Sequence, residues 1–150
     1  MNESTLRALL DRERHGVLAT LSMRRAGWPF ASAVPYALAE SGEPVFLLSE
    51  LAEHTRNLRR DARASLLVQD SGASEDPQAG ARVTLLGTAE PDDNEESRRK
   101  YVARHRQARE YLALGDFKIW RLSVTEARYV GGFGEMGWLE GPELRAALES

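Results

Sequence analysis

The order of short apolar runs along the chain constrains the fold more than any other feature of the sequence. Turn-forming residues bound most of these runs, and the predicted strands are 17–23, 30–38, 45–49, 64–69, 82–90, 117–124 and 127–133. Helices are predicted over 4–14, 51–60 and 92–112, and Pro142 opens a last short one. The stretch 92–112 is either one helix or two. Because helices and strands do not alternate regularly, we expect a mainly β fold, an antiparallel β-barrel with peripheral helices.

Two glycines punctuate this pattern. Gly16 is predicted to end the first helix, and Gly87 interrupts the strand 82–90.

The bulk properties narrow the functional classes. A chain of 150 residues fits a single domain over 1–150. With no cysteine it has no disulfide or thiolate site, which suits a reducing compartment, and we expect a cytoplasmic protein. We expect no signal peptide and no membrane span, because the start is polar and no apolar run approaches about 20 residues. The net charge of −3 with interspersed signs predicts no nucleic-acid partner, and the spacing of the histidines predicts no metal site.

The segment 45–58 carries the most specific signal. Here a strand runs directly into a helix, with Ser49 at the junction. The first amides of a helix lack internal partners and suit a phosphate, to which His54 and Thr55 would add donors. In the alternative interpretation Ser49 only caps the helix and His54 is a surface residue, and the spacing alone leaves both open.

The strand 30–38 has a face of small residues. Ala31, Ala33, Pro35 and Ala37 alternate and therefore project to one side. Such a face lets a flat ring approach the backbone closely, whereas the alternative is tight packing against a helix.

The segment 127–141 is rich in glycine but lacks the strand–turn–helix setting of a dinucleotide-binding motif. Glycine within a strand indicates a bulge or a close backbone approach. Trp138 either covers a ring system or fills the end of the barrel.

Taken together, these segments resemble one family, the pyridoxamine 5′-phosphate oxidase-like, FMN-binding split-barrel proteins. Within it the chain is most similar to the branch of haem-utilisation (HugZ-type) proteins. The resemblance runs through nearly the whole chain, in ASAVPYAL (31–38), LLSELAEHTRNL (47–58), ARASLLVQ (62–69), DPQAGARVTLLGTAE (76–90) and IWRLSVTEARYVGGFGEMGWL (119–139).

The resemblance implies a six-stranded antiparallel Greek-key split barrel and a homodimer with FMN in the clefts between subunits. It also implies a set of cofactor-binding residues, which are Ser32, Ala33, Val34, Pro35, Ser49, His54, Thr55, Asn57, Arg82 and Trp138. Ser49, His54 and Thr55 match the segment that holds the FMN phosphate. Glu53 and His54 stand where the wider family often has Arg and Lys, and Arg82, from either chain, would supply positive charge.

These features lead to one main functional hypothesis and several alternatives. The main one is an FMN-dependent oxidoreductase acting on a small molecule of unknown identity, with no nameable catalytic residue. The alternatives are a non-enzymatic carrier or regulatory protein that binds haem or flavin, and a deazaflavin-dependent reductase on the same fold.

Overall fold

The computed structural model describes residues 3–72, 75–131 and 134–150. The helices are α1 (Glu3–Arg12), α2 (Glu53–Arg60), α3 (Glu95–Arg104), α4 (Ala108–Ala113) and α5 (Gly141–Glu149). The strands are β1 (His15–Leu21), β2 (Pro29–Pro35), β3 (Ala37–Leu38), β4 (Pro44–Ser49), β5 (Arg63–Gln69), β6 (Arg82–Pro91), β7 (Phe117–Val130) and β8 (Met136–Glu140).

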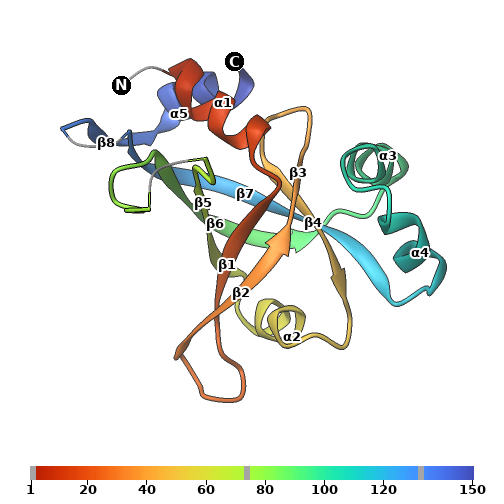
Figure 1. Cartoon of the computed structure of the whole chain (residues 1–150). Coiled ribbons are helices and arrows are strands. Elements are labelled where there is room, and N and C mark those ends of the chain that lie inside the picture. Colours follow the sequence, from red (N-terminus) through yellow and green to blue (C-terminus); the bar gives the residue numbers. More distant parts are fainter. Residues whose placement is uncertain (1–2, 73–74, 132–133) are drawn as a thin grey trace.

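All eight strands belong to one antiparallel sheet in the order β2-β1-β5-β6-β7-β4-β3, with β8 added along β7. The meander β5-β6-β7 lies beside β4, which is the Greek-key arrangement. The two edge strands, β2 and β3, follow each other in the chain, so the sheet curls round on itself (Figure 1). Counting β2 and β3 as one bent strand and leaving β8 aside, the barrel has the six strands that were predicted.

Tyr36 is the point at which the predicted strand 30–38 bends. Its backbone amide donates to the carbonyl of Arg14, and its carbonyl accepts from His105 Nε2 at 2.6 Å. The buried phenol donates to the carbonyl of Leu10 at 2.7 Å. The amide thus extends the β1–β2 register by one position, whereas the carbonyl bonds outside the sheet, and the chain turns here from β1 towards β4.

The barrel has two differently covered ends (Figure 1). Helices α1 and α5 lie side by side at one end, near both termini, and α2 lies at the other, under the β1–β2 hairpin. Helices α3 and α4 pack along β3, β4 and the start of β7. None of the helices in the described ranges is long and apolar enough to cross a membrane.

Inward-facing side chains fill the main core. Its largest members include Trp120, Tyr129, Phe46 and Leu85, all almost completely buried. A smaller cluster under α3 and α4 contains Tyr101 and Ile119.

The structure corrects the prediction for Gly16 and confirms an irregularity at Gly87. Gly16 lies inside β1 rather than at a helix end. Glycine is needed there because a Cβ would come within 2.8 Å of the Leu66 side chain and of the Leu67 carbonyl. At Gly87 strand β6 continues through a bulge, where an added Cβ would meet the carbonyl oxygen of Ser123 at 1.9 Å.

The chain after residue 91 also differs from the prediction. The strands predicted over 117–124 and 127–133 are one long strand, β7, whereas the stretch 92–112 forms two helices, which confirms the broken form that the sequence left open. Gly132 and Phe133 lie outside the described residues. The glycine-rich segment after them contains a strand that was not predicted, β8, because glycine masks its alternation.

Candidate functional site

The structure brings two predicted site residues, Ser32 and His54, into contact. Ser32 points inward from β2, His54 lies in the first turn of α2, and Ser32 Oγ is 3.1 Å from His54 Nδ1. Both side chains are half-buried. Burial lowers the pKa of His54 below its ordinary value, so the imidazole is neutral at pH 7.

Ser49 and Thr55 lie at the start of α2 as predicted, but their hydroxyl protons are already engaged. Ser49 Oγ donates to Asp116 Oδ2 at 3.3 Å, and Thr55 Oγ1 donates to the carbonyl of Ser49 at 2.6 Å. A hydroxyl has one proton to donate. In this arrangement neither side chain has a donor left for a phosphate.

The charges around this segment are mostly paired. Glu50 accepts from Arg59 at 2.7 Å, and this hydrogen bond holds the pKa of Glu50 below its ordinary value. Lys118 lies 4.0 Å from the same carboxylate. What remains for an anion is the start of α2, which has no side-chain cap, and the exposed Arg56.

Asn57, another predicted cofactor residue, is completely buried. Its Oδ1 accepts from the amide of Met23 at 2.9 Å, and its Nδ2 donates to Thr20 Oγ1 at 3.0 Å. Both polar ends of the amide thus fasten the β1–β2 hairpin to α2.

The β1–β2 hairpin carries exposed aromatic side chains that the sequence analysis did not single out. Trp28 is 60% exposed and Phe30 36% exposed, and Met23 lies in the same turn. The guanidinium of Arg25 lies 4.5 Å from the Trp28 ring centre. The detectable signal was an aromatic residue on each side of Pro29, at a turn where apolar residues are not needed for folding.

The predicted small-residue face lies on the outside of the barrel. Ala33 is exposed and Pro35 half-exposed, whereas Val34 points inward and is buried. No helix covers Ala31 or Ala33, so the alternative of tight helix packing does not apply to them. Ala37, which follows the bend, is buried.

Trp138 and Arg82 lie far from this strand within one chain. The register runs from Ala33 through Val17, Leu67, Thr84 and Arg128 to Trp138 in a single row across six strands. Five strand spacings are about 24 Å. Arg82 opens β6, three strands from β2, and donates to the carbonyls of Gln78 and Gly80. The strand order thus separates both residues from β2, which carries Ser32, by three or more strands within one chain.

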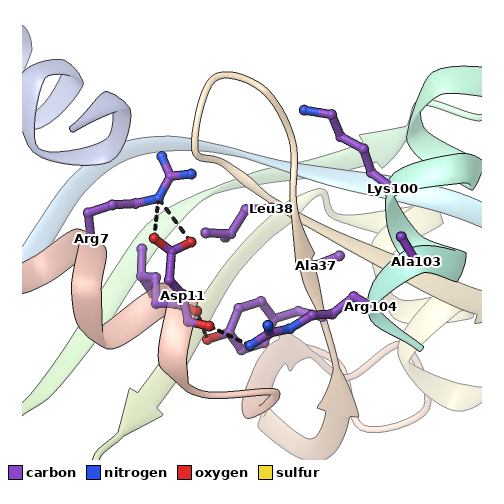
Figure 2. A pocket seen from close by; sticks show the side chains of 9 residues that line it. Arg7, Asp11, Ala37, Leu38, Lys100, Ala103 and Arg104 are labelled. Carbon is purple, nitrogen blue, oxygen red and sulfur yellow. Dashed lines mark hydrogen bonds and ion pairs between the residues drawn. The ribbon is translucent and has the colours of Figure 1, made fainter. Parts of the chain in front are cut away.

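A separate cavity of about 380 Å³ lies between α1, β3 and α3 (Figure 2). Figure 2 shows Arg7 and Arg104 projecting into it, with Lys100 at its rim. Arg7 is held by the Asp11 carboxylate and the Leu148 carbonyl, and Arg104 by the carbonyls of Asp11 and Glu13. These bonds join α1 to its neighbours, so the two arginines have structural roles.

Comparison with known proteins identifies relatives. A family model described as the CREG β-barrel matches residues 3–144. The chain is 33% identical over 132 residues, 85% of its length, to "Non-canonical heme oxygenase HOZ, chloroplastic" of Arabidopsis thaliana, and it spans 39% of that protein.

Solved structures show the same similarity. A heme-binding protein from Mycobacterium smegmatis superposes with a TM-score of 0.87 and 38% identity, over 96% of this chain and 60% of that one. A member of the pyridoxinephosphate oxidase family from Clostridium acetobutylicum superposes with a TM-score of 0.72 over 96% of this chain and 99% of its own. At 14% identity, that likeness shows the split-barrel fold alone.

Proposed function

The chain belongs to the CREG β-barrel family, and we propose that it binds haem. The proposal is supported by two relatives above 30% identity that are described as a heme-binding protein and a heme oxygenase. Because the chain spans 60% and 39% of their lengths, the proposal concerns binding and not the complete activity of either protein.

The observation that carries the proposal is the exposed aromatic surface of the β1–β2 hairpin, beside the half-buried His54. A porphyrin is flat and mostly apolar, and sites for such groups are lined by hydrophobic and aromatic side chains. Met23, Trp28 and Phe30 supply such a surface. Arg24 and Arg25, in the same turn, supply positive charge for the two propionates.

FMN, which the family resemblance implied, is less well supported by these residues. Its phosphate would need donors at the start of α2, and the hydroxyls of Ser49 and Thr55 are engaged within the chain. Arg56 and the uncapped helix start remain, so FMN is the competing ligand in the experiment below. We therefore give the haem carrier precedence over the FMN-dependent oxidoreductase.

We further propose that the protein is a homodimer. The outer sheet face carries exposed apolar side chains, among them Val17, Met136 and Trp138, together with the exposed small residues Ala31 and Ala33 of β2. An exposed patch of this kind marks an interaction surface. Light scattering should give twice the chain mass of 16.7 kDa, and 16.7 kDa itself at micromolar concentration would contradict the dimer.

A cytoplasmic location stays a prediction, since the plant relative is chloroplastic.

Titration of the purified apoprotein with hemin and, separately, with FMN tests the proposal. We expect a Soret band that saturates at a fixed stoichiometry, and no comparable binding of FMN. Tight FMN binding without a saturable Soret band would refute it.

A tryptophan pair locates the bound group. Trp28 and Trp138 are 60% and 56% exposed and each lies under an arginine, so their alanine variants are matched controls for each other. If a porphyrin covers Trp28, Trp28→Ala should weaken haem binding by about one to two decades, from about 1.5–3 kcal/mol of lost burial. An equal loss in Trp138→Ala would place a second subunit's tryptophan at the site, and no loss in either variant would remove the hairpin from it.

A further inference from the structure

We propose that His54 would bind the haem iron and that Ser32 is the residue that positions it. The inference rests on the proposed function, because it names the iron ligand of that same site.

The three histidines of the chain differ in what their rings can still bind. His105 is 4% exposed, and its Nε2 is committed to the carbonyl of Tyr36 at 2.6 Å. His15 is exposed and lies at the start of β1, where it pairs with Pro35. It is therefore three positions along the strands from the pair that contains Ser32. His54 is half-buried and lies at the α2 end, beside the exposed aromatic hairpin.

The contact with Ser32 leaves one ring nitrogen of His54 available. His54 Nδ1 lies 3.1 Å from Ser32 Oγ, so the serine oxygen can accept a hydrogen bond from Nδ1–H. In that tautomer the other ring nitrogen, Nε2, carries the lone pair. Histidines that bind metals characteristically donate their other ring N–H in this way, which fixes the tautomer and the ring orientation.

His54 Nε2 is also open to a ligand from outside. Within the described residues it has no hydrogen-bond partner, and the buried side-chain nitrogen that lacks one there is Trp120 Nε1. Nε2 of His54 is therefore not completely buried, and it has no partner among the described residues.

The surroundings of His54 suit a porphyrin and are held in place. Phe30 shares the inward face of β2 with Ser32, two residues away, and is 36% exposed. The buried Asn57, one turn after His54, holds the amide of Met23 and thereby the hairpin against α2. An imidazole with a free Nε2, a positioning hydroxyl and an apolar wall thus occupy one end of the barrel.

The experiment compares hemin complexes of the wild type and three variants by Soret absorption and low-temperature EPR of the ferric form. His54→Ala should lose the spectrum of the histidine-bound iron, and added imidazole should restore it. His15→Ala, the matched control at the other end of β1, should keep the wild-type spectrum. Ser32→Ala should keep histidine ligation but bind hemin about 10–100-fold more weakly, the usual effect of removing a partner of a metal-binding histidine.

The outcomes separate this inference from the proposed function. If the wild type binds hemin and His54→Ala has the wild-type spectrum, haem binding stands and His54 is not the ligand. Transfer of the spectral change to His15→Ala overturns the assignment in favour of His15. If the wild type has no saturable Soret band, the proposed function itself fails. Should His54→Ala melt well below the wild type, His54→Gln takes its place, because glutamine keeps a polar side chain of similar size and cannot replace imidazole in the spectrum.

Discussion

Asn57→Ala should destabilise the protein strongly and release the β1–β2 hairpin from α2. The side chain is completely buried, and its loss removes two hydrogen bonds, one to the amide of Met23 and one to the hydroxyl of Thr20. Each bond contributes about 1 kcal/mol, and a buried group left without its partner adds about 1–3 kcal/mol. We therefore expect the free energy of unfolding to fall by about 3–5 kcal/mol, which lowers the melting temperature of a domain of this size by about 6–20 °C.

Calorimetry or thermal circular dichroism measures this shift, with Asn94→Ala as the matched control. Asn94 is exposed and caps α3 by accepting from the amide of Ser97 at 2.9 Å, so its replacement should cost only about 1 kcal/mol. A double-mutant cycle with Thr20→Val would isolate the bond between the two side chains. If Asn57→Ala melts with the wild type but no longer binds the cofactor, the structural role is wrong and Asn57 touches the ligand, as the family resemblance implied.

Two further predictions concern backbone packing and pH. Gly87→Ala should lower the midpoint of urea unfolding, because the new Cβ would meet the Ser123 carbonyl oxygen at 1.9 Å. The control Gly72→Ala, where the nearest atom is at 3.4 Å, should leave the midpoint unchanged. Equal midpoints for the two variants would contradict the close approach at the bulge. Burial lowers the pKa of His54 and of His105. Below about pH 6.5 the unfolded chain therefore binds more protons than the folded chain. The contribution of these two histidines to stability should be constant above that pH and fall as the pH drops towards the lowered pKa values. Melting temperatures recorded from pH 8 to 5 test this, and a flat profile in the wild type would contradict it.

The barrel was predictable because its strands are short, apolar and separated by turns. The details that were missed depend on contacts between distant residues. At the bend, the carbonyl of Tyr36 bonds to His105, which is 69 positions away in sequence and lies outside the sheet. Gly16 resembles a helix stop, and its role becomes clear only when β5 is seen to pass within contact distance.

The candidate site was predictable in part for a related reason. Strand alternation places Ser32 on the face opposite Ala33, and helix geometry places His54 near the start of α2. Their contact spans 22 positions of sequence and depends on how α2 closes the barrel end. Asn57 was grouped with the cofactor residues because it adjoins them in sequence, although its amide is turned inward to Thr20 and Met23.

The choice between haem and flavin depends on a few residues at the rim of the barrel and not on its core. The inward residues that fix the fold, such as Leu85 and Trp120, are almost completely buried and therefore present no surface to a ligand at the rim. At the start of α2 the carboxylate of Asp116 accepts the hydrogen bond from the Ser49 hydroxyl, which is therefore not available to a phosphate. In the first turn of α2, His54 Nδ1 contacts Ser32 Oγ, so the other ring nitrogen, Nε2, is left for a metal. Under the proposed function, both contacts favour haem over a cofactor that carries a phosphate. Asp116→Ala should therefore free the Ser49 hydroxyl and increase the affinity for FMN without altering the hemin spectrum, and an unchanged affinity for FMN would show that the hydroxyl is not what limits phosphate binding.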